Sequence, residues 1–394
     1  MTGAMTALAV VALAAWVWLA VDHHGFWRSV PELRGAAGRP APVSRVPVDV
    51  VVPARDEAES IAASLGSLLA QDYAGEMRIV MVDDGSSDGT LAIARSVAAS
   101  VGPERLKVIA GVPAAPGWSG KLWALAQGIE RAAEAGCEGG AGRAAAEYLL
   151  LTDADIVHAP GHLAALVGKA EAERLDLVSE MVALRCQSLA ERTLVPAFVF
   201  FFQLLYPFAA VNDTDRRIAA AAGGTILLRR SALGRIGGLA TIRSALIDDV
   251  ALARAVKPAG RIWLGHTRLA RSLRAYPQFA DIWRMIARTA FVQLRYSPVL
   301  LAATLLGMGL LFLLPPLAGV FGTGVGRWAG LAAWALAALL YLPTIRRYGR
   351  SPLWAPFLPL VAGFYLAATI GSAFDHWHGR GAIWKGRAYD GART

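Results

Sequence analysis

Strand-like and helix-like segments alternate from Val46 onward, and this alternation restricts the possible folds more than any other feature of the chain. Short apolar runs predict strands at 48–53, 77–82, 106–110, 148–152 and 226–228. Helical patterns are predicted at 58–70, 90–99, 121–134 and from 248, with a Gly/Ala-rich loop at 134–146. The alternation predicts an α/β fold with a mostly parallel, Rossmann-like sheet between helices. Ligands bind at the carboxyl ends of the strands in such sheets.

Four apolar stretches flank this region and predict a membrane protein. Hydrophobic residues make up 55% of the chain and the mean hydropathy is +0.44, too apolar for an ordinary soluble domain. The run at 6–21 predicts an uncleaved anchor within residues 1–27, because no Lys or Arg precedes it and no clear cleavage site follows. Runs at 298–320, 328–342 and 353–374 predict transmembrane helices within residues 298–375, followed by a basic tail at 376–394.

The net charge of +9 favours an anionic membrane surface over nucleic acid as the partner, because the arginines lie beside apolar stretches. The positive residues that follow the first run place the next domain in the cytoplasm, so we expect a multi-pass protein of the inner (cytoplasmic) membrane. If all three later runs cross, however, the tail ends outside despite its basic residues. Either the tail is an exception, or one run is re-entrant, and Pro315-Pro316 makes the first a candidate.

Two further apolar segments are predicted to meet the membrane without crossing it. The segment 194–211 is interrupted by Pro196 and Pro207, which favours an interfacial or acceptor-lining role over a transmembrane helix. Residues 278–297 place apolar side chains at helical spacing with arginines off that face, as in an amphipathic helix lying on a membrane. An ordinary helix facing the protein core is the alternative.

Two pairs of aspartates, Asp83-Asp84 and Asp153-x-Asp155, each follow a predicted strand and carry the clearest chemical signal. Carboxylate oxygens are the ligands that Mg²⁺ and Mn²⁺ select, so the pairs indicate a site for a nucleotide-diphosphate substrate and its metal. The first pair can also hydrogen-bond a uracil edge or a ribose hydroxyl, although a helix-capping turn has the same pattern. The residues 53–57 at the end of the first strand strengthen the functional interpretation.

Three more motifs are candidate parts of the same site. Lys121 precedes a helix, where it could pair with phosphate, or it is a solvated lysine. The glycines at 223–224 allow close approach of an acceptor, or form a simple turn. Asp248-Asp249 could supply the general base that an acceptor hydroxyl needs, or a helix N-cap. His266 is expected to be structural.

Together these motifs resemble those of family 2 glycosyltransferases with the GT-A fold, over about residues 46–297. The resemblance implies an inverting, metal-dependent hexosyltransferase that uses a nucleotide-diphosphate sugar, preferably a UDP-sugar, with Mg²⁺ or Mn²⁺. The nucleotide sugar would bind at 46–160 and the acceptor at 161–277. The implied nucleotide-sugar ligands are Pro53, Arg55, Glu57, Asp83, Asp84, Lys121 and Asp153. The resemblance also implies a metal at Asp153 and Asp155, an acceptor at Gly223 and Gly224, and a catalytic pair formed by Asp249, as the base, and Asp248.

Stretches at 117–125, 220–224, 245–249, 287–298 and 384–387 are similar to the hopene-associated glycosyltransferases, which implies a lipid acceptor, with a hopanoid as candidate. Polyprenyl phosphate or another glycolipid is the alternative acceptor, and a non-catalytic nucleotide-sugar-binding scaffold is the alternative of another class. The sequence departs from the family twice. Processive synthases carry Gln-x-x-Arg-Trp, whereas Tyr296 ends the corresponding segment here. The usual Glu-Asp base motif is Asp248-Asp249.

Overall fold

The computed structural model describes residues 2–35, 44–138, 146–379, 383–384 and 387–388, and these separate into two compact units. The sheet unit contains Pro31–Arg185 and Val211–Arg274, and the helical unit contains Met1–Val30, Cys186–Ala210 and Ala275–Ile383. The segments 186–210 and 275–297 therefore belong to the helical unit, although the sequence analysis placed them in one catalytic domain at 46–297. Their apolar helices pack with other helices of that unit.

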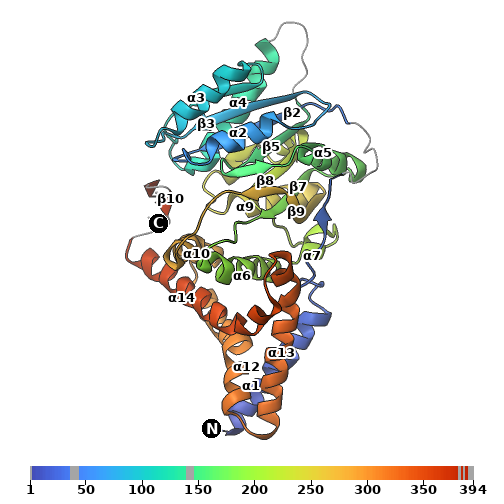
Figure 1. The fold of residues 1–394 in the computed structure, drawn as a ribbon, viewed down its shortest axis with the longest axis vertical. Helices are drawn as coiled ribbons and strands as arrows, with labels where there is room; N and C mark the ends of the chain where they lie inside the picture. The colour runs from blue at the N-terminus through green and yellow to red at the C-terminus, as the bar shows by residue number, and fades with distance from the viewer. Residues whose placement is uncertain (1, 36–43, 139–145, 380–382, 385–386, 389–394) are drawn as a thin grey trace. The chain divides into compact units, whose positions relative to one another are not determined.

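The sheet unit is built on a nine-stranded sheet of order β1-β9-β7-β8-β5-β2-β3-β4, with β6 paired to β9 (Figure 1). Most neighbours are parallel, but β8 runs antiparallel to β5 and β7, and β6 runs antiparallel to β9. The predicted α/β fold with a mostly parallel sheet is confirmed. The strands are β1 Glu32–Leu33, β2 Val48–Ala54, β3 Met77–Asp83, β4 Leu106–Ala110, β5 Tyr148–Thr152, β6 Ile156–His158, β7 Leu177–Ala183, β8 Thr225–Arg229 and β9 Ile262–Ser272.

Helices cover both faces of this sheet because successive strand residues point to opposite sides. Ile79 and Met81 of β3 join the large core formed with α2 and α5, whereas Val80 and Val82 pack against Ala124 of α4 and its neighbours. Helix α4 extends to Glu138, past the predicted end at 134, and residues 139–145 of the predicted loop lie outside the described part. The helices are α2 Ile61–Leu69, α3 Thr90–Val101, α4 Gly120–Glu138, α5 His162–Glu173, α7 Phe208–Asn212, α8 Arg230–Arg235 and α9 Asp248–Val256, with 3₁₀ turns η1 Leu239–Ile242 and η2 Lys257–Ala259.

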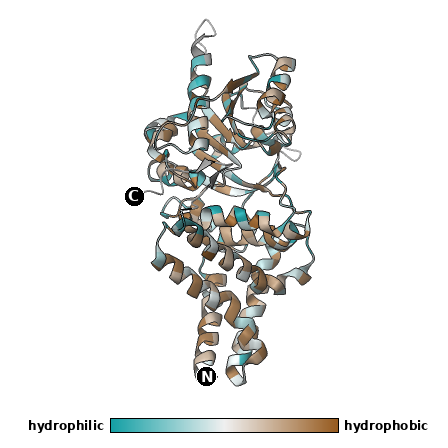
Figure 2. Ribbon diagram, turned by 90° about the vertical axis from the view of Figure 1, so that its left-hand side faces the viewer, coloured by the Kyte–Doolittle hydropathy of each residue, from teal (hydrophilic) through white to brown (hydrophobic). Residues whose placement is uncertain are grey.

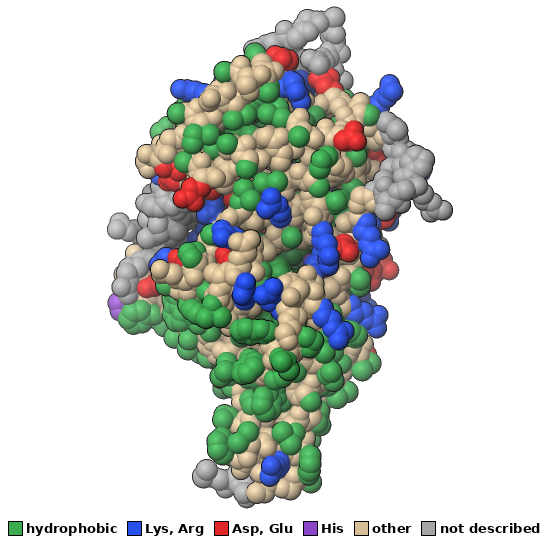
Figure 3. Space-filling model, in the orientation of Figure 1, with side chains coloured by type: hydrophobic (Ala, Val, Ile, Leu, Met, Phe, Trp, Pro, Cys, Tyr) green, Lys and Arg blue, Asp and Glu red, His purple; other side chains and the backbone are tan. Residues whose placement is uncertain are grey.

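The helical unit contains four helices long and apolar enough to cross a membrane, at Gly3–Val21, Pro298–Phe321, Gly324–Arg347 and Pro352–Trp377. Their ribbons are coloured mainly as hydrophobic in Figure 2, and many hydrophobic side chains lie on the face of these helices seen in Figure 3. Each contains one of the four predicted apolar runs, so the prediction of four helices long and apolar enough to cross a membrane is confirmed. The elements are α1 Thr2–Val21, α6 Leu189–Leu205, α10 Phe279–Gln293, α11 Pro298–Met308, the π-helix η3 Gly309–Leu313, α12 Leu314–Phe321, α13 Gly324–Arg347, the 3₁₀ helix η4 Pro352–Phe357 and α14 Leu358–Trp377.

The Pro315-Pro316 pair does not break the second of these helices. The chain passes from α11 through the π-helix η3 into α12 without a loop, as a π-turn near proline permits. Pro315 cannot donate a hydrogen bond to the carbonyl of Leu311, and the indole nitrogen of Trp16 in α1 donates to it instead at 2.7 Å. A contact from another helix thus replaces the missing donor.

Two segments predicted to lie at the membrane form regular helices. Helix α6 runs through Pro196 without ending, which corrects the expected break there, and it ends before Pro207. Its N-terminus is held by a capping box in which Ser188 and Glu191 satisfy each other's backbone amides, so the helix begins at a defined residue. Helix α10 buries Ile282 and Phe291 against α14, so its apolar face is largely covered by another helix.

Candidate active site

Four sequence motifs meet at one edge of the sheet because of strand order and direction. β2 lies between β3 and β5 and is parallel to both, so the residues that follow Ala54, Asp83 and Thr152 emerge at the same edge. β8 is antiparallel to β5, and its first residue, Thr225, pairs with Thr152. This reversal brings the preceding glycine pair to the same edge as the D-x-D motif.

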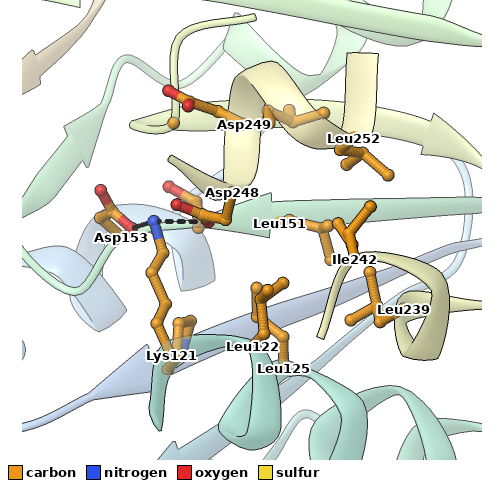
Figure 4. A pocket seen from close by; sticks show the side chains of 14 residues that line it. Lys121, Leu122, Leu125, Leu151, Asp153, Leu239, Ile242, Asp248, Asp249 and Leu252 are labelled. Atoms are coloured by element: carbon orange, nitrogen blue, oxygen red, sulfur yellow. Dashed lines mark ion pairs between the residues drawn. The ribbon is translucent and has the colours of Figure 1, made fainter. Parts of the chain in front are cut away.

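Lys121 lies at the centre of this site and contacts carboxylates from two motifs (Figure 4). Its Nζ is 2.8 Å from Asp153 Oδ1 and 3.3 Å from Asp248 Oδ2. Burial lowers the pKa of Lys121, but the neighbouring carboxylates of Asp153 and Asp248 outweigh it and raise the pKa above its ordinary value. The side chain is therefore an ammonium ion at physiological pH, and it joins the D-x-D motif to the Asp248-Asp249 pair.

Asp249 lies beside Asp248 at the start of α9 but has different surroundings. Its Oδ1 accepts a hydrogen bond from the backbone amide of Val250 at 2.7 Å. Its Oδ2 faces Gly223, where an added Cβ would lie only 3.1 Å away. Burial and then the charge of Asp248 raise the pKa of Asp249 to about 7. A carboxylate with such a pKa can both accept and release a proton near neutral pH.

The second carboxylate of the D-x-D motif is held by the end of β9. Asp155 Oδ2 accepts hydrogen bonds from Ser272 Oγ at 2.9 Å and from Arg274 Nε at 3.1 Å. Arg274 also forms an ion pair with Glu57 of the 53–57 motif. The sequence analysis missed Ser272 and Arg274, because β9 was not predicted as a strand. The apolar run at 262–264 and the three arginines after it, at 268, 271 and 274, were the available signals.

Asp83 and Asp84 are buried at the end of β3, and the structure is compatible with both interpretations of this pair. Asp83 Oδ2 accepts a hydrogen bond from the amide of Ser86 at 3.1 Å, as in the turn interpretation. Asp83 Oδ1 is buried, and no described residue hydrogen-bonds to it. Arg55 Nη1 donates to the carbonyl of Asp84 at 2.5 Å and lies 3.7 Å from its Oδ2.

The two predicted acceptor glycines point in different directions. Gly223 borders the pocket that holds Lys121 and Asp249, whereas a Cβ on Gly224 would meet Val182 at 3.2 Å inside the protein. The carbonyl of Gly224 accepts a hydrogen bond from the Thr152 hydroxyl at 2.9 Å. Gly224 therefore serves packing beneath the site. The pocket is lined by Pro53, Lys121, Leu122, Leu125, Leu151, Thr152, Asp153, Gly223, Ile226, Leu239, Ile242, Asp248, Asp249 and Leu252.

The two D-x-D carboxylates suit a divalent cation that arrives with its substrate. Within the described part of the chain, no three His, Cys, Asp or Glu side chains converge to hold a metal ion. Mg²⁺ commonly takes one or two protein carboxylates and completes its shell with substrate phosphates and water. Asp153 and Asp155 match that donor set, but each is paired with a cation, Lys121 or Arg274.

A chain of buried polar side chains lies behind the D-x-D motif. The Thr152 hydroxyl is 3.2 Å from His158 Nε2, and His158 Nδ1 is 2.9 Å from His162 Nδ1. His162 in turn contacts the carboxylate of Glu180 on β7. Burial, and then the neighbouring His162, lower the pKa of His158 to about 3. His266, expected to be structural, is fully buried in β9.

Comparisons with known proteins identify sequences and folds that this chain resembles. Residues 49–237 match the family model described as glycosyl transferase family 2. The mannosyltransferase PcManGT from Pyrobaculum calidifontis, solved with GDP-Man and Mn²⁺, is 19% identical, with a TM-score of 0.55 over 94% of this chain and 99% of that chain. TarS from S. aureus is 16% identical, with a TM-score of 0.41 over 76% of this chain and 55% of that chain. The likeness to PcManGT shows the GT-A fold.

A relative of known activity matches a short part of the chain. An N-acetylglucosaminyltransferase from Sinorhizobium fredii is 37% identical over 83 residues, which is 20% of this chain. The match also spans only about a fifth (20%) of that relative's length.

Proposed function

Because residues 49–237 match the family model described as glycosyl transferase family 2, we propose that the protein transfers a sugar, with inversion, from a nucleotide-diphosphate sugar to a membrane lipid. The observation that carries this proposal is the double contact of Lys121, which joins the D-x-D carboxylate Asp153 to Asp248, next to Asp249. A group that binds diphosphate and a group that can accept a proton thus lie in one pocket. A sugar transfer needs both.

In the proposed reaction, the residues of this pocket divide two tasks between them. Asp249 takes the proton of the acceptor hydroxyl, whose oxygen then bonds to the anomeric carbon from the face opposite the leaving group. The bond from that carbon to the diphosphate oxygen breaks, and the nucleoside diphosphate leaves with the electron pair. Lys121 stabilises the negative charge on the diphosphate. Asp83 and Asp84 hold the nucleoside, for which uridine is our first candidate.

Asp155 and Asp153 would hold Mg²⁺ or Mn²⁺, which offsets the charge of the diphosphate when it is bound. The pairing of Asp155 with Ser272 and Arg274 supports this assignment, because metal-binding carboxylates are commonly oriented by hydrogen bonds from neighbouring groups. PcManGT was solved with Mn²⁺, which supports a divalent cation here as well.

We further propose a lipid acceptor and an inner-membrane location with the sheet unit in the cytoplasm. Four helices that could cross a membrane support the membrane location. The positive residues after the first helix support the cytoplasmic side. The similarity of five sequence stretches to hopene-associated glycosyltransferases makes a hopanoid hydroxyl the first acceptor to test.

The direct test is release of nucleoside diphosphate by the full-length protein in detergent. UDP- and GDP-sugars would be combined with Mn²⁺ or Mg²⁺, with and without a hopanoid polyol or polyprenyl phosphate. We expect release that depends on one lipid and falls by at least about a hundredfold in Asp249→Asn. A polyprenyl phosphate acceptor is already ionised, so a weak effect of Asp249→Asn with that lipid would identify it instead. Nucleotide binding without any turnover would favour a non-catalytic scaffold.

A further inference from the structure

Lys121 lies at the start of a helix, a position that does not favour a cation. It nevertheless contacts carboxylates of two different motifs. It is the second residue of α4, where the helix dipole repels a cation. Its Nζ nevertheless lies 2.8 Å from Asp153 Oδ1 and 3.3 Å from Asp248 Oδ2. The ammonium is therefore held in place by the two carboxylates.

The space around this ammonium is confined. A Cβ on Gly223 would lie 3.5 Å from Lys121 Nζ and 3.1 Å from Asp249 Oδ2. The side chains of Lys121 and Asp248 are only 20% and 21% exposed. Two like charges repel strongly in such a partly buried place. A second cation would therefore be disfavoured at Asp153 while Lys121 remains there.

We propose that Lys121 is a resident counter-ion that keeps divalent cations away from Asp153 until a nucleotide diphosphate enters the site. This inference rests on the proposed function, because it assigns the diphosphate as the group that moves Lys121. The phosphates offer the ammonium a new negative partner and offer the metal additional oxygen ligands. Lys121 passes from Asp153 to the diphosphate, and Asp153 becomes available to the incoming complex.

The exchange couples the binding of metal and donor. Each ligand favours the arrangement in which Lys121 has left Asp153, so each strengthens the binding of the other by the same factor. Without donor, the Lys121 ammonium stays beside Asp153, and the site has little affinity for free metal. The acidic pocket is thus protected from cations that would bind without substrate.

The test measures Mn²⁺ binding to the full-length protein in detergent, by the electron paramagnetic resonance of free Mn²⁺, with and without UDP or GDP. We expect Lys121→Met to bind Mn²⁺ roughly tenfold more tightly than the wild type in the absence of nucleotide. The gain in Mn²⁺ affinity on adding nucleotide should shrink in this variant. Lys121→Arg keeps the charge and should retain weak metal binding. Equal donor-free affinities in Lys121→Met and the wild type would overturn the proposal.

Matched variants separate the local effect from a general change of charge. Lys107→Met removes a lysine from β4 of the same unit and should leave the Mn²⁺ affinity unchanged. In an Asp153→Asn background, Lys121→Met should no longer tighten Mn²⁺ binding, because the shared carboxylate is gone. If Lys121→Met does not fold, Lys121→Gln removes the charge and keeps hydrogen-bond donors for the same measurement. Tightening that persists in the Asp153→Asn background would contradict the assigned contact.

This experiment distinguishes the counter-ion role from the function on which it rests. If neither UDP nor GDP binds the wild type, the proposed donor class fails. The Mn²⁺ affinities of Lys121→Met and Lys121→Arg without nucleotide still test the counter-ion role in that case. If nucleotide and metal bind together but Lys121→Met leaves the donor-free Mn²⁺ affinity unchanged, the function stands and the counter-ion role fails.

Discussion

Asp248 and Asp249 are adjacent in sequence, yet their surroundings suit them to different tasks. Asp248 is tied to the Lys121 ammonium at 3.3 Å, whereas Asp249 directs one oxygen toward Gly223. Asp249, which the sequence analysis predicted as the base, therefore remains our proposal for the group that takes the acceptor proton.

The pH dependence of transfer tests this assignment. Burial and then Asp248 raise the pKa of Asp249 to about 7, and Asp249 accepts a proton only when it is ionised. We therefore expect kcat/KM to increase as the pH rises through about 7 and to level off above it. A pH–rate profile measures this, and Asp249→Asn should remove the rising limb. A wild-type profile that is flat through this range would exclude Asp249 as the titrating base.

The adjacent glycines provide a matched pair of substitutions. In Gly223→Ala, the new Cβ would crowd Asp249 Oδ2 at 3.1 Å, so we expect kcat to fall by roughly tenfold or more with little change in thermal stability. In Gly224→Ala, the Cβ would meet Val182 at 3.2 Å, and such overpacking destabilises a core by about 1–3 kcal/mol. Steady-state kinetics and thermal unfolding of both variants measure the difference. Identical behaviour of the two would show that the glycines do not divide their roles.

At the scale of elements, β6 and α5 bury two histidines between the D-x-D motif and Glu180 of β7. The chain of contacts from Thr152 through His158 and His162 ties the end of β5 to the next helix and to a second strand. Buried polar groups of this kind stabilise a fold only while each keeps its partner. Protonation of a member is therefore expected to affect folding.

His158 predicts an acid-sensitive stability. Burial and then His162 lower its pKa to about 3 in the folded protein, whereas an unfolded histidine has a pKa near 6.5. Between these values the unfolded chain binds the extra proton, so stability is fully present above about 6.5 and falls by up to about 1.4 kcal/mol per pH unit below it.

Chemical denaturation at several pH values measures this slope. We expect His158→Gln to flatten it, with His376→Gln, in the helical unit, as a control that leaves it unchanged. An unaltered slope in His158→Gln would assign the acid sensitivity to other groups.

At the scale of the whole molecule, the helices of the helical unit divide into two groups by their partners. Helices α1, α12 and α13 pack on one another, and Gly319 and Gly330 permit their close approach. Helix α14 instead lies along α10, with Trp283 against Gly371 and the rings of Phe291 and Trp377 5.7 Å apart. The main partner of α14 is therefore an amphipathic helix, and its contacts with η3, α11 and α13 are smaller.

This division predicts the side of the membrane on which the C-terminus lies. Helix α10 carries the exposed Arg284, which is costly in the hydrocarbon region, so α10 and the α14 segment along it are expected at the membrane surface. The helices at 298–321 and 324–347 would then form a hairpin that returns the chain to its starting side. We expect the basic tail to lie on the cytoplasmic side, which removes the conflict with the positive-inside rule.

Reporter fusions measure this topology. A green fluorescent protein after Thr394 should fluoresce, and alkaline phosphatase fused there should be inactive. The same reporters inserted after Gly322, between α12 and α13, should give the opposite pattern and serve as the control. Active phosphatase at the C-terminus would show that α14 crosses the membrane.

The sequence alone was sufficient to predict strands β2, β3, β5 and β8 of the site, the four apolar helices and the carboxylate pairs at the strand ends, but not β9. These features depend on residues close together in the chain. A run of valines predicts a strand, and two aspartates after a strand predict a candidate site, whatever the rest of the chain packs against. The mostly parallel α/β sheet could be predicted on this basis, and the GT-A fold was implied by the resemblance of the motifs to family 2 glycosyltransferases.

Only the tertiary structure decided which distant groups meet. The antiparallel insertion of β8 brings Gly223 to the D-x-D edge, and the contact of Lys121 with Asp248 joins residues far apart in sequence. Three further contacts were likewise not predictable: the ion pair of Arg274 with Asp155, the close packing of Gly224 against Val182, and the packing of α14 on α10. Such pairings depend on strand order and on which faces become buried, and these are set by the packing of the whole chain and not by local periodicity.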